Sequence, residues 1–211
     1  MSYSNGNSCC DDNTMTLIGK GRITAEPDIA VLRLGVETTG ENLTTAQAEN
    51  ARLSQAVLQS LRQLGVEDIK TFQYAINRLI VFENNQSIDK GYSVRNILEI
   101  RTDNMNQVGL LIDTAVQNGA NVVDLISFEV SDTYEYYLQA LNLAVINASD
   151  KAKAIAETLG IMNPPIPIRI IENETTPVPF QTIGLREGFV STPIEAGTHQ
   201  IEASVTVVFA F

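Results

Sequence analysis

The side chains that most often carry out catalysis are few in this sequence and stand apart from one another. His199 is the only histidine, so a Ser-His-Asp triad could form only around this residue. No cysteine and no cluster of acidic residues stands beside it, and we interpret His199 as a residue at the edge of a loop. The sequence also lacks an HExxH motif, a CxxC motif and a spaced set of histidines and aspartates. We therefore expect no catalytic residues, no metal site and no cofactor.

The segment Gly19-Lys20-Gly21 invites a phosphate-binding interpretation. A P-loop needs four residues between its two glycines and a serine or threonine after the lysine, and this stretch has neither. The two glycines fall inside a strand-like pattern, where glycine permits a bulge or the close approach of another backbone. We favour close backbone packing over phosphate binding.

The acidic residues do not form an obvious pair for acid–base chemistry. Such chemistry needs two carboxyls in one cleft with different proton affinities. Glu26 and Asp28 flank a turn proline, and Glu172 and Glu174 precede a long loop. We interpret all four as solvated residues.

Tyr92 and Asn96 are the candidate structural or ligand positions. Both fall on the apolar face of a predicted strand, whose other members are Val94, Leu98 and Ile100. If Asn96 is buried there, its amide needs hydrogen-bond partners. We favour a structural network around Asn96 and keep a ligand site as the alternative.

Cys9 and Cys10 are the only cysteines, so no framework of internal disulfides can stabilise the fold. They lie in a polar segment without hydrophobic periodicity, which we expect to be a flexible tail over residues 1–14. Adjacent cysteines rarely form a disulfide with each other because the ring strains the intervening peptide bond. We interpret them as inert thiols, with intermolecular crosslinking, metal capture and a redox role left open.

Hydrophobic periodicity predicts the elements that must position these residues. Apolar side chains three and four residues apart indicate a helix, and strict alternation indicates a half-buried strand. The three main helices are expected at 44–64, 104–118 and 133–159. The strands are expected at 16–23, 29–39, 69–83, 92–102, 122–130, 166–171 and 201–211. The third and fourth strands form a long hairpin in the middle of the chain.

Helices and strands do not alternate regularly, which disfavours a parallel doubly wound sheet and indicates an α+β fold with antiparallel sheets. We expect two interleaved α/β subdomains within residues 15–211. Subdomain A comprises about 15–75 plus 161–211, and subdomain B about 76–160. The last helix has an alanine-rich stripe, which predicts unusually close packing against a sheet.

Charge and hydropathy exclude two classes of partner. Acidic residues outnumber basic ones 25 to 14, giving a net charge of −11 that repels nucleic acid. No apolar run approaches the roughly 20 residues that a membrane-spanning helix needs. The first 13 residues carry no signal-peptide pattern, so the chain is expected to be cytoplasmic if residue 1 is the native start.

Several short motifs, in order and spacing, make the sequence from Thr16 to Phe211 resemble the SIMPL-domain family, a bacterial domain of unknown function. This family includes periplasmic immunogenic proteins and oxidative-stress-defence proteins. The motifs are Gly19-Lys20-Gly21, Glu26-Pro27-Asp28, Ile69-Lys70-Thr71, Gly91-Tyr92-Ser93-Val94-Arg95-Asn96, Gly119-Ala120-Asn121, the alanine-rich helix around Ala148, and Pro193-Ile194-Glu195-Ala196-Gly197.

The resemblance implies an α+β protein that assembles into large homo-oligomers, some ring- or channel-like, without an established catalytic mechanism. It also implies a periplasmic location, association with the cell envelope and a link to oxidative stress. Cys9 and Cys10 stand outside the family pattern and inherit no role from it.

We therefore expect a non-enzymatic, self-assembling protein whose partner is a second copy of itself. The long loop over 175–198, rich in proline, glycine and threonine, supports an interface role. The alternative is a small-molecule-binding protein or hydrolase that uses Tyr92, Asn96 and nearby acids in a cleft between the subdomains. Redox sensing by Cys9 and Cys10 is a third hypothesis.

Overall fold

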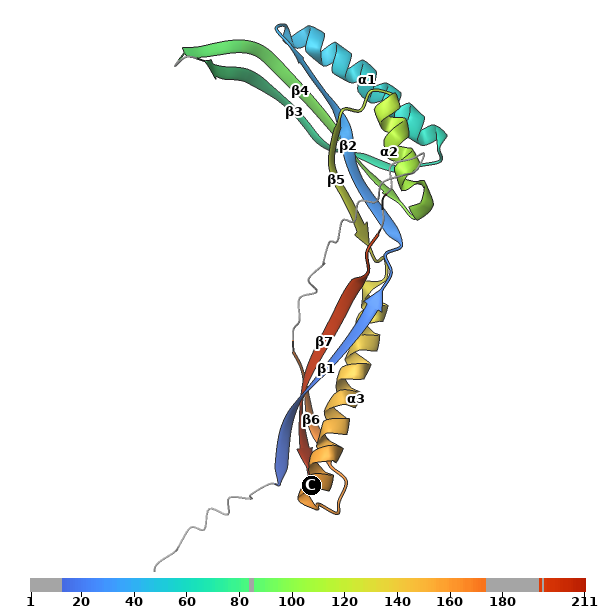
Figure 1. The fold of residues 1–211 in the computed structure, drawn as a ribbon, viewed down its shortest axis with the longest axis vertical. Helices are drawn as coiled ribbons and strands as arrows, with labels where there is room; N and C mark the ends of the chain where they lie inside the picture. Colours follow the sequence, from blue (N-terminus) through green and yellow to red (C-terminus); the bar gives the residue numbers. More distant parts are fainter. Residues whose placement is uncertain (1–12, 84–85, 174–193, 195) are drawn as a thin grey trace, which may run out of the picture. The chain divides into compact units, whose positions relative to one another are not determined.

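The computed structural model describes residues 13–83, 86–173, 194 and 196–211 and confirms the α+β class, with three α-helices and two antiparallel sheets. The elements divide between two compact units, each built from distant parts of the chain (Figure 1). The long loop after residue 173 and the tail with Cys9 and Cys10 fall almost entirely outside the described residues.

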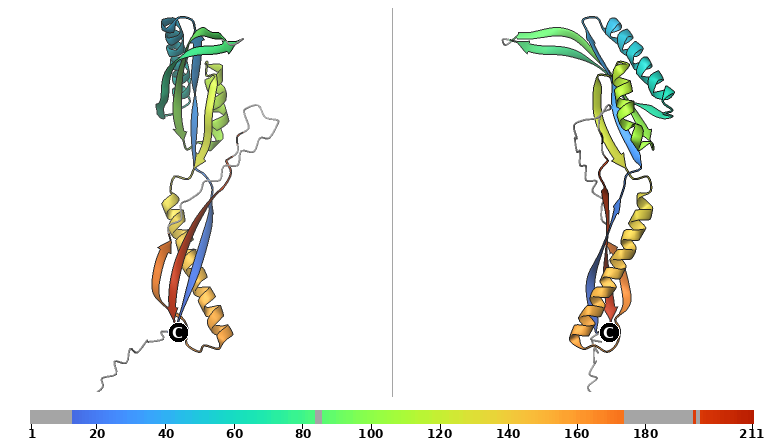
Figure 2. Two further views of the ribbon diagram at one scale, coloured as in Figure 1. Left: turned by 90° about the vertical axis from the view of Figure 1, so that its left-hand side faces the viewer. Right: turned by 45° about the vertical axis from the view of Figure 1, so that its right-hand side comes forward.

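The first unit is a three-stranded sheet covered by one long helix, α3 (Figure 2). Its strands are antiparallel in the order β1-β7-β6. Their alternating residues turn one face of the sheet toward α3, as the period of two predicts. The four elements are β1 (Thr14–Ala25), α3 (Thr133–Leu159), β6 (Ile166–Asn173) and β7 (His199–Ala210).

The helix α3 approaches β1 closely because small residues line both surfaces. Its buried residues are the alanines at every fourth position from Ala140 to Ala156. A Cβ atom on Gly19 would lie 2.0 Å from the carbonyl oxygen of Ala144, and one on Gly21 would lie 1.9 Å from that of Ala140. The structure therefore confirms that the two glycines serve close backbone packing and that the alanine stripe faces a sheet.

The second unit is a four-stranded antiparallel sheet in the order β3-β4-β2-β5, with α1 and α2 on one face (Figure 2). Its core joins the even-numbered residues of β2, such as Leu32 and Leu34, to Val57 and Leu61 of α1 and Leu111 of α2. The elements are β2 (Ile29–Gly40), α1 (Leu43–Gln63), β3 (Asp68–Glu83), β4 (Gln86–Thr102), the 3₁₀ turn η1 (Met105–Gln107), α2 (Val108–Gln117) and β5 (Val122–Glu129).

The ends of the helices follow local signals in the sequence. Asp132 caps α3, because its side chain accepts a hydrogen bond from the backbone N–H of Glu135 at 3.1 Å, and Gly160 ends this helix at φ +69°. The helix α1 begins at Leu43, one residue before the expected range 44–64. The cap is Asn42, whose side chain accepts a hydrogen bond from the N–H of Thr45 at 3.2 Å.

The two units divide the chain differently from the predicted subdomains. Among the described residues, the first unit takes 13–25, 132–173 and 199–211, and the second takes 26–83, 86–131, 194 and 196–198. The first helix and the long hairpin therefore belong together, and α3 joins the terminal strands instead. The physical reason is the glycine–alanine contact between β1 and α3, which ties the start of the chain to its last helix.

Candidate functional site

Tyr92 and Asn96 lie on the face of β4 that α1 covers, but they do not form one site. Tyr92 lies opposite Gly40 of β2, and Asn96 lies opposite Val36 of the same strand. Four residues along a strand separate their side chains by about 13 Å. The buried Val94 stands between them.

The side-chain oxygen of Asn96 is buried, and no described atom donates a hydrogen bond to it. A buried polar atom without a partner loses hydration and gains nothing in return, which costs about 1–3 kcal/mol. The expected structural network therefore does not include this oxygen. This oxygen can still accept a hydrogen bond from one donor, such as a bound water or a small polar ligand.

The polar network under α1 is built instead around Asn50. This residue is 1% exposed, and its Nδ2 donates to the carbonyl oxygens of Val36 at 3.0 Å and Val94 at 2.8 Å. Ser54 donates to the Oδ1 of Asn50 at 3.3 Å. The amide thus bridges β2 and β4 and fixes α1 on the sheet. Asn50 is not among the residues predicted from the sequence, although its polar side chain on the apolar stripe of a helix is a signal of such a role.

The opposite face of the sheet carries paired charges. Glu99 is 7% exposed and bonds to Arg33 at 2.8 Å and Lys70 at 2.9 Å. Hydrogen bonds from Lys70 and Arg33 hold the pKa of this carboxyl below its usual value. The guanidinium of Arg33 also stacks over the ring of Phe72, 3.7 Å from its centre.

A second set of charges on this face centres on Arg95. Its guanidinium bonds to Asp124 at 2.5 Å and to Glu37 at 3.0 Å. The contact with Asp124 raises the pKa of Arg95. The hydroxyl of Ser93 donates a hydrogen bond to the carboxylate of Glu37. The side chain of Asn121 accepts a hydrogen bond from the backbone N–H of Glu37 and donates one to its carbonyl oxygen. These contacts join strands β2, β4 and β5, so the charges are engaged in holding the sheet together.

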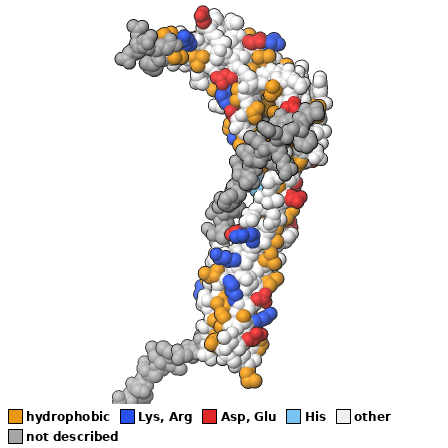
Figure 3. All heavy atoms as spheres, in the orientation of Figure 1, with side chains coloured by type: hydrophobic (Ala, Val, Ile, Leu, Met, Phe, Trp, Pro, Cys, Tyr) orange, Lys and Arg blue, Asp and Glu red, His pale blue; other side chains and the backbone are white. Residues whose placement is uncertain are grey.

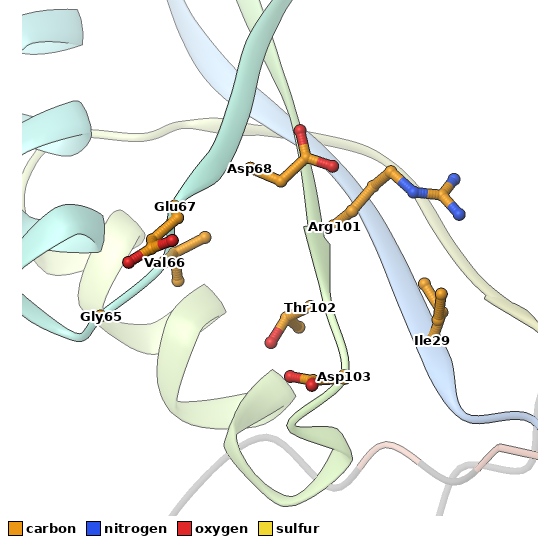
Figure 4. A pocket seen from close by; sticks show the side chains of 8 residues that line it. All are labelled: Ile29, Gly65, Val66, Glu67, Asp68, Arg101, Thr102 and Asp103. Atoms are coloured by element: carbon orange, nitrogen blue, oxygen red, sulfur yellow. The ribbon is translucent and has the colours of Figure 1, made fainter. Parts of the chain in front are cut away.

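A cleft of about 420 Å³ opens at one end of the second unit (Figure 4). Three carboxylates line it, together with Arg101, which bonds to Glu129 at 2.8 Å. Neither Tyr92 nor Asn96 reaches this cleft. The lining residues are Ile29, Gly65, Val66, Glu67, Asp68, Arg101, Thr102 and Asp103. Within the described residues, no group of three or more histidine, cysteine or acidic side chains could hold a metal ion.

The other residues that the sequence singled out have local roles or fall outside the described residues. Asp28 accepts hydrogen bonds from the backbone and hydroxyl of Ser131, which lower the pKa of Asp28. The carboxylate of Glu172 accepts a hydrogen bond from the hydroxyl of Tyr137. His199 begins β7 and pairs with Ala25. Cys9, Cys10 and Glu174 lie outside the described residues.

Large apolar side chains reach the surface of both units (Figure 3). In the first unit they lie on α3 and, most densely along the chain, on β6, which is an outer strand of its sheet in the order of described strands. All but one of its eight residues are exposed. The exposed isoleucines of β6 are Ile166, Ile168, Ile170 and Ile171, with exposed fractions of 62%, 58%, 53% and 41%.

A comparison of the sequence with family models matches residues 15–209 to SIMPL, described as a protein of unknown function (DUF541). The chain belongs to the SIMPL family. The match covers both units, and it begins after Cys9 and Cys10.

Two relatives of this SIMPL protein show how far the similarity extends. The 26 kDa periplasmic immunogenic protein of Brucella melitensis is 28% identical over 92% of this chain and 83% of its own length. The uncharacterized protein YggE of Escherichia coli K12 is 26% identical over 65% of this chain and 57% of its own length. Within the described part of the SIMPL chain, no helix combines the length and hydropathy needed to cross a membrane.

Proposed function

We propose that this SIMPL protein is a non-enzymatic, self-assembling protein whose partner is a second copy of itself. The observation that supports the proposal is the outer strand β6, with four isoleucines between 41% and 62% exposed. A long hydrophobic outer strand offers unpaired backbone groups and apolar side chains to another chain. Strand pairing with a second copy would satisfy both.

The charged groups favour a structural role over catalysis. A general acid or base needs a pKa near the working pH. Contacts move the pKa of Asp28, Glu49, Asp89 and Glu99 downward, away from neutrality. Carboxyls of this kind stay charged and stabilise their partners.

We extend the proposal to the compartment and the physiological role of this protein, on the basis of its similarity to the relative from Brucella and to the family. The relative from Brucella is named as periplasmic, and we extend that compartment and an association with the cell envelope to this chain. The link to oxidative stress follows from the family resemblance. In cells that lack the protein, we expect wild-type chain to restore survival in peroxide, and an assembly-deficient variant to fail. Equal rescue by both chains would separate the stress role from assembly.

Light scattering on the purified protein at micromolar concentration tests self-assembly directly. We expect a mass several times the 23.0 kDa of one chain. Ile168→Lys should lower this mass, because a charge on β6 disfavours strand pairing. Asn142→Lys, at an exposed polar position of α3, is the control and should leave the mass unchanged. A wild-type mass of one chain at every concentration would overturn the proposal.

The cleft in the second unit supports an alternative function as a small-molecule-binding protein or hydrolase. Its volume of about 420 Å³ lies in the range of ligand sites, and its carboxylates would suit an amine-bearing molecule. Spermidine and L-arginine should then raise the melting temperature of the wild type but not of Asp68→Asn. An unchanged melting temperature with both compounds would remove this alternative.

A further inference from the structure

The hairpin of β3 and β4 extends beyond the rest of its sheet as a two-stranded arm. The last residue pair between β2 and β4 joins Gly40 to Tyr92. Beyond this point β4 pairs with β3 alone among the described strands, as in the pairs Ile80–Asp89 and Val81–Ile88 (Figure 1). A lone two-stranded ribbon is marginally stable in water and needs a third strand or a packing surface.

The arm has apolar side chains on both of its faces. Ile80 and Val81 are neighbours in β3, so their side chains point to opposite faces, and they are 50% and 41% exposed. Ile76, at the base of the arm, is 40% exposed. Apolar residues on both sides of a ribbon indicate that another surface covers it.

The charges and the tip of the arm favour a protein surface over a lipid bilayer. Arg78 forms an ion pair with Asp89 inside the arm. The remaining charged residues of the arm, Glu83 and Lys90, have opposite signs, so the arm offers no net positive charge to anionic lipids. The sequence between its strands is the polar Asn84-Asn85, which does not favour insertion of the tip into hydrocarbon.

The same chain offers a surface that matches the arm. The strand β6 is an outer strand with four exposed isoleucines, and its two charged residues, Arg169 and Glu172, also balance. Among the strands described, β3 is an outer strand of the other sheet over its whole length. Two neutral, apolar strand edges can join through backbone hydrogen bonds, as in β-strand addition.

We propose that the arm of one copy docks along β6 of a second copy, with the edge of β3 pairing to the edge of β6. The proposal rests on the self-assembly proposed above and specifies its contact. The two surfaces differ, so the contact is heterologous and propagates from copy to copy. Such contacts close into rings or continue as open chains.

Mixing two assembly-deficient variants distinguishes this contact from a symmetric one. Ile80→Lys disables the arm, and Ile168→Lys disables β6. Each variant alone should have the mass of one chain, 23.0 kDa. In a mixture, the intact arm of one variant can still dock on the intact β6 of the other. We therefore expect a heterodimer of twice that mass, which cannot grow further.

The controls are charged substitutions at polar positions close to each surface. Ser87→Lys, at an exposed position of the arm, and Asn142→Lys on α3 should both assemble like the wild type. Circular dichroism checks that all variants are folded. If Ile80→Lys or Ile168→Lys keeps the wild-type mass, or if their mixture contains only single chains, the proposed contact is wrong.

Disulfide trapping is a second measurement that needs only small substitutions. Ile80→Cys and Ile168→Cys are introduced separately into a Cys9→Ser, Cys10→Ser background. The two chains carry tags of different length, so that their disulfide products can be distinguished, and they are mixed and oxidised. We expect the mixed disulfide to exceed both homodisulfides. Predominant arm-to-arm disulfides would overturn the proposal. Flotation with phosphatidylglycerol vesicles tests the bilayer as the partner instead. If the wild type floats with the vesicles and Ile80→Lys does not, the proposal is also overturned. A monomeric wild type would overturn self-assembly itself, whereas an assembled wild type without the mixed disulfide would overturn only this contact.

Discussion

At the scale of single residues, burial and hydrogen bonding separate two asparagines that face the same helix. Asn50 is satisfied by two backbone carbonyls and a serine hydroxyl, whereas the buried oxygen of Asn96 has no donor among the described atoms. The residue type is the same in both cases, so the sequence alone gives them the same needs. Only the positions of the neighbouring donors and acceptors distinguish them.

This difference predicts unequal effects of removing the two amides. Asn50→Ala leaves the carbonyls of Val36 and Val94 without their side-chain donor and should lower the free energy of unfolding by about 2–3 kcal/mol. Asn96→Ala should cost less than Asn50→Ala, because the Asn96 oxygen loses no hydrogen bond. Urea denaturation of both variants measures the difference. A larger loss for Asn96→Ala would mean that its amide binds something essential to the fold.

Glu99 predicts a dependence of stability on acid pH. Its folded pKa is lowered by Lys70 and Arg33, so its contribution is present above the ordinary glutamate pKa of about 4.3 and is lost as the pH falls through the lowered value. Between about pH 5 and pH 3, Glu99→Gln should therefore lose less stability than the wild type. Urea midpoints across this range measure the slope, with Glu157→Gln on α3 as the control. Parallel slopes for wild type and Glu99→Gln would contradict the prediction.

At the scale of elements, most helices and strands follow from local patterns. The helix α3 occupies the predicted residues 133–159, and Gly65, Gly91 and Gly119 have positive φ values of +84°, +92° and +109°. These features depend on residues close in sequence, such as caps and turn glycines. The paired residues of β1 and β7 lie 174 to 196 positions apart along the chain, so this pairing depends on contacts that no local pattern reports.

The close contact of β1 with α3 predicts that Gly19→Ala destabilises the protein by about 3 kcal/mol. The added methyl group would overlap the backbone of Ala144, which cannot move without displacing α3. Gly40→Ala is the matched control, since its Cβ would lie 3.5 Å from the Cβ of Ala46, in ordinary contact. Thermal and urea unfolding measure both. Equal stability of the two variants would show that α3 can withdraw from β1 at little cost.

At the scale of the whole molecule, the exposed apolar strands predict that stability depends on protein concentration. If chains unfold from an assembly, a tenfold increase in concentration favours the folded state by about 1.4 kcal/mol and raises the melting temperature by about 3 °C. Differential scanning calorimetry over two decades of concentration tests this for the wild type. Ile168→Lys should melt at a temperature independent of concentration. The same independence in the wild type would contradict assembly.

The sequence by itself determined the α+β class, the types of the elements, most of their ends and the membership in the SIMPL family. These properties rest on periodicity, caps and short motifs, which act over a few residues. The tertiary structure decided how the chain divides into two units, why Gly19 and Gly21 are glycines, and that Asn50, not Asn96, holds α1 on its sheet. It also revealed the arm and the exposed face of β6. Burial and strand order depend on which distant segments meet, and no single segment carries that information.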